Sequence, residues 1–120
     1  MISLIIPIFH EEARLEALLA HLHNLGTKGE YEIIIVDGDP QRTIIKRIRQ
    51  RRGLVMITSE KGRGRQMNAG ARHAKGDILL FLHADTLLPF GALEKVTFIM
   101  QKNIYIWGVH LIWVWIPQTY

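Results

Sequence analysis

The pattern of apolar and polar positions changes period near the start of the chain. Residues 2–9 form a continuous apolar run rich in β-branched side chains, which is typical of a strand covered on both faces. Between residues 11 and 26 the apolar positions recur at helical spacing, after two acids that favour the helix dipole. These apolar positions are Leu15, Leu18, Leu19 and Leu22. The pattern predicts a buried strand followed by an amphipathic helix.

The same alternation continues through the middle of the chain. Apolar runs at residues 31–36, 54–58 and 77–82 predict further strands, with helical patterns between them. The apolar positions of the first helical segment are isoleucines, namely Ile44, Ile45 and Ile48. Those of the second are mostly small residues, namely Met67, Ala71 and Ala74. Strands and helices at this spacing predict an α/β fold, with a doubly wound, mostly parallel sheet and helices on both faces. The site of such a sheet lies at the carboxyl ends of its strands.

Length and composition fit a single folded domain. The chain has 120 residues, of which 48% are hydrophobic and 22% are charged, as in ordinary globular proteins. This length is short for an enzyme that holds two substrates. The absence of cysteine excludes disulfides, thiolate metal sites and a cysteine nucleophile. The net charge of +4 favours anionic partners, such as nucleotide diphosphates, anionic lipid or nucleic acid, without choosing among them.

Targeting and membrane signals add little to this picture. The N-terminal apolar run has no basic leader and no small-residue cleavage site, so we expect a buried strand in a cytoplasmic protein rather than a signal peptide. The apolar, tryptophan-containing stretch 104–116 is shorter than the roughly 17 to 25 residues of a membrane helix. The basic run 46–52 has no interleaved aromatic residues that would stack on bases, so we expect no nucleic-acid partner. Peripheral contact with an anionic membrane stays open.

Polar clusters follow directly after some of the predicted strands. They are His10-Glu11-Glu12, Asp37-Gly38-Asp39 and His83-Ala84-Asp85. Because the carboxyl ends of parallel strands meet in one crevice, we expect these clusters to converge. Their acids can accept hydrogen bonds from a base N–H or a ribose hydroxyl, and they can ligate a hard divalent cation that neutralises a diphosphate. The clusters therefore outline a nucleotide-sugar site.

Simpler interpretations of some of these features stay open. His83 and Asp85 can face one metal from an extended segment, but Asp85 can equally cap a turn and His83 can be an ordinary hydrogen-bonded histidine. The segment 61–65 has three cations and two glycines before a helix, which suits phosphate binding and equally a solvated loop. It is not a dinucleotide fingerprint, because Met67 stands where the third glycine belongs, and it lacks the Gly-Lys-Ser/Thr end of a P-loop.

Segments of the chain, taken in order, resemble the family-2 glycosyltransferases of the GT-A fold. These segments are 5–12 (IIPIFHEE), 35–38 (IVDG), 62–71 (GRGRQMNAGA) and 80–86 (LFLHADT). The first is similar to the family's first strand and its exit, and the second to the aspartate turn of its second strand. The last two resemble a bacterial subgroup whose Asp-x-Asp motif reads His-Ala-Asp, with some members labelled as arsenosugar-pathway transferases. The resemblance covers residues 2 to about 95.

The resemblance implies roles for the candidate residues of a Rossmann-like nucleotide-sugar-binding half. Glu11 and Asp37 would contact the nucleotide base or the ribose. Arg63 would approach the base or the diphosphate, and Pro7 would shape the wall of the pocket. These residues come from separate segments of the sequence, so the implied site depends on the fold that brings them together.

The resemblance also implies metal-dependent chemistry. Asp85 would hold a divalent cation, manganese or magnesium, while His83 stands at the first acidic position of the family's metal motif and its part in ligation is left open. The implied reaction is inverting transfer of a sugar from a nucleotide diphosphate, usually UDP, to an acceptor hydroxyl. The acceptor, lipid-linked or a small molecule, cannot be identified from the sequence.

The last part of the chain departs from the family pattern. The family places a carboxylate base in its second half, but no acidic residue follows Glu94. We therefore expect a nucleotide-sugar-binding domain over residues 1–100 and an atypical apolar tail over 101–120, the product of a truncation or a reading-frame change. A non-catalytic nucleotide-binding remnant is the alternative, and homo-oligomer formation stays open. A nucleotidyltransferase is disfavoured, because its phosphate loop would directly follow the first strand.

Overall fold

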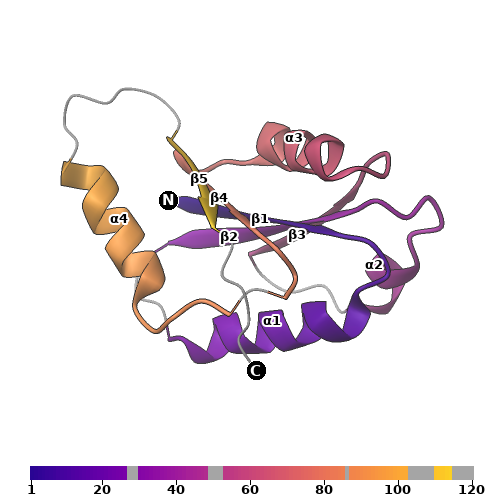
Figure 1. The fold of residues 1–120 in the computed structure, drawn as a ribbon, viewed down its shortest axis with the longest axis horizontal. Helices are drawn as coiled ribbons and strands as arrows, with labels where there is room; N and C mark the ends of the chain where they lie inside the picture. Colours follow the sequence, from indigo (N-terminus) through magenta and orange to yellow (C-terminus); the bar gives the residue numbers. More distant parts are fainter. Residues whose placement is uncertain (27–29, 49–52, 86, 103–109, 115–120) are drawn as a thin grey trace.

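Strands and helices alternate along the whole described chain in this computed structural model. It describes residues 1–26, 30–48, 53–85, 87–102 and 110–114. In order, the elements are β1 (Ile2–Ile8), α1 (Glu12–Asn24), β2 (Tyr31–Asp37), α2 (Thr43–Arg47), β3 (Leu54–Thr58), α3 (Arg63–His73), β4 (Ile78–Leu82), α4 (Ala92–Lys102) and β5 (His110–Val114). The α/β class predicted from the sequence is confirmed (Figure 1).

The strands of the described residues form a five-stranded sheet in the order β3-β2-β1-β4-β5. All of its neighbouring strands run parallel, as predicted. The register places Ile8 opposite Asp37, and Asp37 opposite Thr58, so the carboxyl ends of β1, β2 and β3 lie along one edge. The chain order reverses between β1 and β4. This reversal is the switch point at which open parallel sheets bind ligands.

The two faces of the sheet are covered by different helices. Apolar residues of α1, α2 and α4 pack against one face, whereas α3 is the helix that the described residues place on the other (Figure 1). Because successive side chains of a strand point to opposite faces, Leu4, Ile6 and Ile8 belong to the first core and Ile5 belongs to the second. The prediction of helices on both faces is confirmed.

Helix α3 lies close to the sheet because a glycine faces the strands. A Cβ added at Gly70 would lie 2.5 Å from Cγ2 of Ile5 and 3.1 Å from Cγ2 of Val36. The first turn of α3 therefore reaches the carboxyl edge of the sheet. The helix begins at Arg63, so the segment predicted as a loop up to residue 65 already contains its first turn.

A polar network ties the strands together at the opposite edge. The Ser3 hydroxyl donates a 2.6 Å hydrogen bond to the buried Glu32 carboxylate, and the Lys75 backbone N–H donates to the same carboxylate at 2.6 Å. The backbone N–H of Gly76 donates to the Ser3 hydroxyl oxygen at 2.9 Å. These hydrogen bonds hold the connection from α3 to β4 against β1 and β2. They thereby fix the position at which β4 begins to pair with β1.

Helix α2 is shorter than predicted, and part of the C-terminal segment forms a strand that the sequence did not predict. Helix α2 ends at Arg47, and the predicted basic end at residues 49–52 lies outside the described residues. Within the predicted tail, β5 pairs with β4, with His110 opposite Ile78, while residues 103–109 and 115–120 lie outside the description. The boundary at residue 100 stays a prediction. Among the described helices, none combines the length and apolar character needed to cross a bilayer.

Candidate functional site

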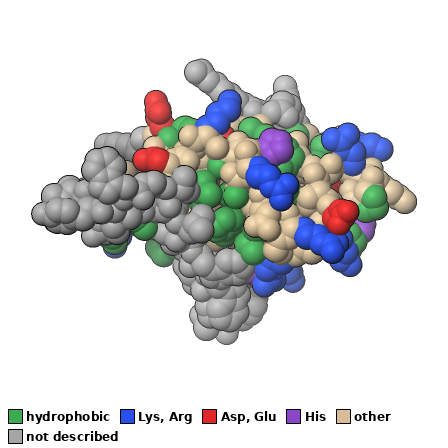
Figure 2. All heavy atoms as spheres, turned by 90° about the horizontal axis from the view of Figure 1, so that it is seen from above, with side chains coloured by type: hydrophobic (Ala, Val, Ile, Leu, Met, Phe, Trp, Pro, Cys, Tyr) green, Lys and Arg blue, Asp and Glu red, His purple; other side chains and the backbone are tan. Residues whose placement is uncertain are grey.

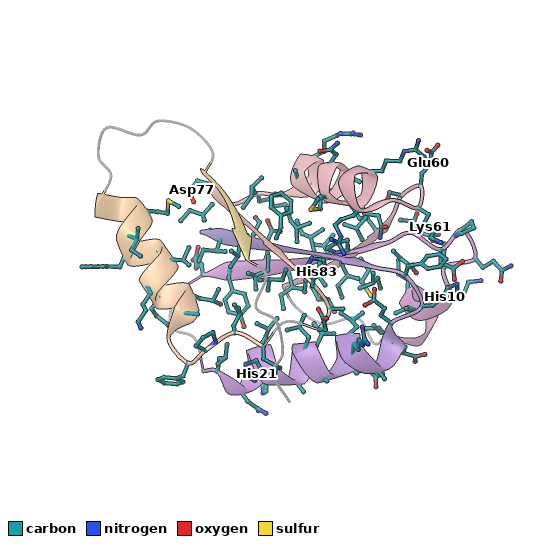
Figure 3. All side chains as sticks on the ribbon, viewed as in Figure 1. His10, His21, Glu60, Lys61, Asp77 and His83 are labelled. Atoms are coloured by element: carbon teal, nitrogen blue, oxygen red, sulfur yellow. The ribbon has the colours of Figure 1, made fainter. Side chains whose placement is uncertain are left out.

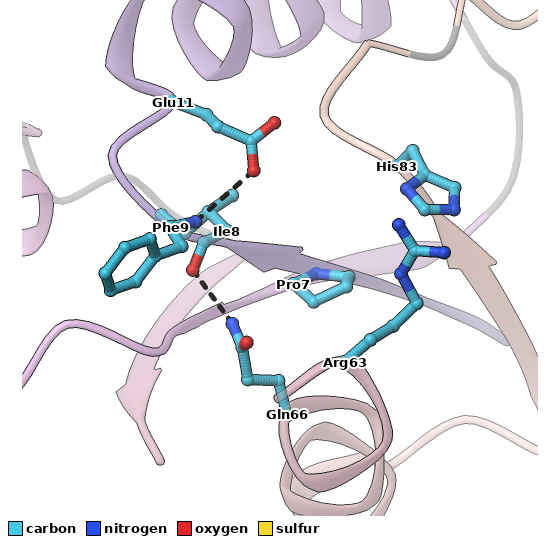
Figure 4. Close-up of a pocket in the computed structure, with 7 residues that line it drawn as sticks. All are labelled: Pro7, Ile8, Phe9, Glu11, Arg63, Gln66 and His83. Carbon is cyan, nitrogen blue, oxygen red and sulfur yellow. Dashed lines mark hydrogen bonds between the residues drawn. The ribbon is translucent and has the colours of Figure 1, made fainter. Parts of the chain in front are cut away.

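A cavity of about 160 Å³ lies at the switch point between β1 and β4 (Figure 4). Its lining is Pro7, Ile8, Phe9, Glu11, Arg63, Gln66 and His83. These residues come from the end of β1, the first turns of α3 and the end of β4. The structure thus brings together Glu11 and His83, which the sequence pattern placed in one crevice, with Pro7 and Arg63, which the family resemblance assigned to the site. Pockets for drug-sized ligands span about 300 to 1,000 Å³, so this cavity holds only part of a nucleotide.

The carboxylate of Glu11 is held at the rim of this cavity. The residue precedes α1, and its Oε1 accepts the backbone N–H of Phe9 at 3.3 Å (Figure 4). Its other carboxylate oxygen, Oε2, lies 3.9 Å from the Arg14 guanidinium. Just before it, His10 adopts a left-handed backbone conformation with φ of 53°. This sharp turn brings Glu11 back toward the strand that the chain has just left.

The guanidinium of Arg63 points toward the imidazole of His83 in the lining of the cavity (Figure 4). Burial lowers the pKa of His83, and the positive charge of Arg63 lowers it further. The carboxylates of Asp85 and Glu11 act in the opposite direction but do not reverse the shift. At neutral pH the imidazole of His83 is therefore uncharged, which is the form that accepts a hydrogen bond or ligates a metal.

Asp37 lies deeper than the sequence implied. It is fully buried at the end of β2, outside the set of residues that line the cavity. Its Oδ1 accepts the backbone N–H of Asp39 at 2.9 Å, and among the described residues Oδ2 has no hydrogen-bond partner. Burial raises the pKa of Asp37; the hydrogen bond from the Asp39 backbone opposes this rise, and the charge of the Asp39 carboxylate adds to it. Contact between Asp37 and a nucleotide stays a prediction.

The raised pKa of Asp37 predicts a pH-dependent stability difference. The folded state keeps the proton at a pH where the unfolded state, with an ordinary value of 3.8, has lost it. The contribution of Asp37 to stability is therefore present at low pH and falls as the pH rises through the folded pKa. The free energy of unfolding of the wild type, minus that of Asp37→Asn, should decrease as the pH is raised above the ordinary value of 3.8 in urea titrations. A constant or increasing difference would contradict the shift.

Asp85 lies in a turn after β4 and is exposed. It lines a second cavity, of about 270 Å³, which it shares with Arg14 and apolar residues of α1. His83 and Asp85 therefore line different cavities, although they are near enough for the charge of Asp85 to act on His83. In the described ranges, no three His, Asp or Glu side chains form a metal-binding group.

Residues that the sequence did not single out also contribute to the site. Phe9 lines the cavity, and its ring has the Lys61 ammonium 4.1 Å from its centroid and the His10 ring edge-on at 4.2 Å. In Figure 3, His10 and Lys61 lie at one end of the sheet and Asp77 at the other. Gln66 is 4% exposed and is hydrogen-bonded to strand ends. Its sequence signal is its spacing of four from Gly70, which places it on the sheet-facing side of α3.

Basic side chains lie on the face of the molecule that α3 covers, and one of them, Arg63, lines the cavity. Figure 2 looks onto this face and shows several lysine and arginine side chains at its surface. Exposed basic residues of α3 and its approach are Lys61, Arg63, Arg65 and Arg72. One of them, Arg65, is paired with Glu60 at 2.8 Å. The first turn of α3 also has no acidic residue, so its N-terminus and Arg63 together favour an anion.

The chain is similar to known glycosyltransferases over most of its length. The sequence model of glycosyl transferase family 2 matches residues 3–112, which extends the similarity past the predicted limit near residue 95. An uncharacterized glycosyltransferase of Haemophilus influenzae is 32% identical over 105 residues, covering 86% of this chain and 35% of the relative. A dolichol-phosphate mannosyltransferase of Pyrococcus furiosus is 32% identical over 100 residues, covering 79% and 28%.

A further relative is an undecaprenyl-phosphate 4-deoxy-4-formamido-L-arabinose transferase of Edwardsiella ictaluri. It is 31% identical over 99 residues, which covers 73% of this chain and 30% of the relative. The chain thus spans about a third of the length of these curated relatives. The parallel sheet, its switch-point cavity and the match over residues 3–112 agree with one another. The chain belongs to the family-2 glycosyltransferases, and its sheet with helices on both faces is the Rossmann-like sheet of the GT-A fold.

Proposed function

We propose that the switch-point cavity binds the nucleotide part of a nucleotide-diphosphate sugar, with UDP as the nucleotide, as the donor for glycosyl transfer. The observation that carries this proposal is the convergence of Glu11, Arg63 and His83 on one cavity from distant parts of the sequence. The carboxylate can accept hydrogen bonds from a base or a ribose, and the guanidinium can bind a diphosphate. The neutral imidazole can accept a further hydrogen bond. Membership of the His-Ala-Asp subgroup is part of the same proposal.

The base and ribose are assigned to the part of the cavity near β1. Pro7 and Ile8 supply its apolar walls, and Glu11 accepts a hydrogen bond from a ribose hydroxyl or a base N–H. Asp37 is fully buried at the end of β2, opposite Ile8, so a contact between its Oδ2 and the imino N–H of uracil would require the turn after β2 to move. The small volume of the cavity favours a pyrimidine over a purine.

The diphosphate is assigned to Arg63 and the first turn of α3, next to His83 and Asp85. Asp85 would hold a magnesium or manganese ion, which is commonly bound by one or two carboxylates together with substrate phosphates. The residues fit such an ion only with the donor present, because the described side chains alone form no three-ligand group. A cation bound there would supply neutralisation of the charge on the departing diphosphate.

The acceptor side of the proposal rests on the relatives. Two of them are named for transfer involving dolichol phosphate and undecaprenyl phosphate, which favours a lipid-linked acceptor and peripheral contact with a membrane. Transfer would be inverting, with attack by an acceptor hydroxyl on the sugar carbon and departure of the nucleotide diphosphate. A nucleotide-binding module without transfer is the second candidate, because the cavity of the described residues is lined by side chains suited to a nucleotide.

Calorimetric titration with UDP and GDP, each with and without manganese, tests the donor site. We expect UDP to bind about tenfold more tightly than GDP, because the cavity is small, and to bind more tightly with manganese. Glu11→Gln should weaken UDP binding by about tenfold, whereas Glu16→Gln, on the exposed side of α1, should leave it unchanged. Failure of the folded wild-type chain to bind either nucleotide would overturn the proposal.

A further inference from the structure

We infer that Gln66 is the positioning residue that locks the nucleotide-contacting segments into one arrangement. The inference rests on the proposed function, and it adds a residue to which neither the motifs nor the relatives assign a role. The side-chain amide of Gln66 lies where the end of β1, the end of β2 and the start of α3 meet. Each of these segments carries a proposed contact to the nucleotide: Glu11, Asp37 and Arg63.

The amide of Gln66 has a partner on every one of these segments. Its Nε2 donates to the carbonyl oxygen of Ile8 at 2.8 Å and to that of Val36 at 2.9 Å (Figure 4 shows the first). Its Oε1 accepts the backbone N–H of Gly62 at 3.2 Å. The backbone N–H of Gly38 also donates to the Ile8 carbonyl, at 3.0 Å. A single buried side chain thus joins the two strand ends to the helix start.

The chemistry of this position calls for an amide. The strand ends offer two carbonyl oxygens, which need donors, while Gly62 offers an N–H, which needs an acceptor. A glutamine side chain supplies two donor hydrogens and an acceptor in one planar group. A carboxylate would place an oxygen against the two carbonyls, and an apolar side chain of similar volume would leave all three backbone groups without this partner.

Gly38 leaves the space that the amide occupies. A Cβ added at this glycine would lie 2.9 Å from both Cδ and Oε1 of Gln66 and 3.1 Å from its Nε2. The glycine in the turn after β2 therefore permits Gln66 to reach both strands. Gln66 and Gly38 form a matched pair, and a change in either should move the same segments.

Amide hydrogen exchange in the wild-type chain tests the arrangement without any nucleotide. The first N–H groups of a helix have no acceptor within the helix, so an amide such as that of Gly64 should exchange quickly. The Gly62 amide lies just before the helix but donates to a buried oxygen, so we expect it to exchange about tenfold more slowly than Gly64. Equal rates at the two glycines would overturn the role of Gln66.

Substitution of Gln66 tests whether the arrangement serves nucleotide binding. Gln66→Met conserves volume but removes all three hydrogen bonds, so UDP affinity should fall by about tenfold or more and the Gly62 amide should lose its protection. Gln66→Glu keeps an acceptor for Gly62 and loses the donors to the strands. In this variant the Gly62 amide should stay protected, the Gly38 amide should exchange faster, and UDP affinity should still fall.

Control variants separate positioning from loss of stability. Leu22→Ala removes a fully buried side chain of α1 away from the cavity, so it should lower thermal stability while UDP affinity stays within about threefold. Gly38→Ala leaves Gln66 in place but displaces its amide, and it should weaken UDP binding as Gln66→Met does. Wild-type affinity in a folded Gln66→Met or Gly38→Ala protein would overturn the inference. Absence of UDP binding by the wild type would instead overturn the proposed function, independently of the exchange result.

Discussion

Asp85→Ala should abolish the manganese-dependent part of UDP binding. Asp85 is the exposed carboxylate in the turn after β4, and it is near enough to His83 for its charge to act on that imidazole. Loss of an outer-shell partner of a metal ligand lowers metal affinity by about 10- to 100-fold, so removal of the carboxylate itself should lower UDP affinity in manganese by on the order of 100-fold. Calorimetric titration should give the same affinity for this variant with and without manganese.

The matched control for this variant is Asp77→Ala. Asp77 is also an exposed aspartate, but it lies at the opposite end of β4, where it pairs with the N-terminal ammonium at 2.9 Å. Its removal should leave the effect of manganese on UDP binding unchanged. If manganese still strengthened UDP binding by Asp85→Ala, Asp85 would not be a ligand of the metal. His83 and Glu11 would then be the next candidate ligands.

Gly76→Ala should destabilise the fold strongly. A Cβ at this position would lie 2.5 Å from the carbonyl oxygen of Met1, 2.7 Å from Oγ of Ser3 and 2.9 Å from the backbone nitrogen of Ser3. Two of these atoms belong to the backbone at the start of β1, so no flexible side chain can move aside. The shift would also break the hydrogen bond from Gly76 to Ser3, and overpacking with a lost buried hydrogen bond amounts to about 2–5 kcal/mol.

Urea unfolding measures this loss, which is a large part of the roughly 5–15 kcal/mol that stabilises a typical domain. Gly64→Ala is the matched control, because it is the same substitution in the first turn of α3, where a Cβ would meet nothing within 4 Å. It should leave stability unchanged or raise it by up to about 1 kcal/mol, since alanine favours a helix over glycine. A Gly76→Ala protein as stable as the wild type would contradict the close approach of β4 to β1.

The layout of the fold was predictable because its strands are buried on both faces. Continuous apolar runs such as residues 2–9 differ clearly from the leucine spacing of α1, and their alternation implies a parallel sheet. The meeting of Glu11 and His83 followed from the same logic, since strand ends of a parallel sheet share an edge. The place of Arg63 was implied by the family resemblance, and Asp37, which the same logic included, does not line the cavity.

The finer features of the site depend on distances that periodicity does not contain. The depth of Asp37 depends on how the turn after β2 folds over it, and the divergence of His83 and Asp85 depends on the turn after β4. Gln66 is a polar residue in a helix with many polar residues, and only the close packing of α3 reveals that it is buried. Three-dimensional contacts between distant segments decide these points.

The pairing of β1 with β4 has a consequence for how the chain acquires its site. These strands are neighbours in space, with Ile2 opposite Ile78, although β2 and β3 lie between them in the sequence. Contacts of such long sequence separation form slowly, because a large loop must close before they gain any energy. Glu11 and Arg63 are both synthesised before β4, but the wall that carries His83 exists only after this closure. The chain would therefore bind a nucleotide only late in folding, after β1 and β4 have paired.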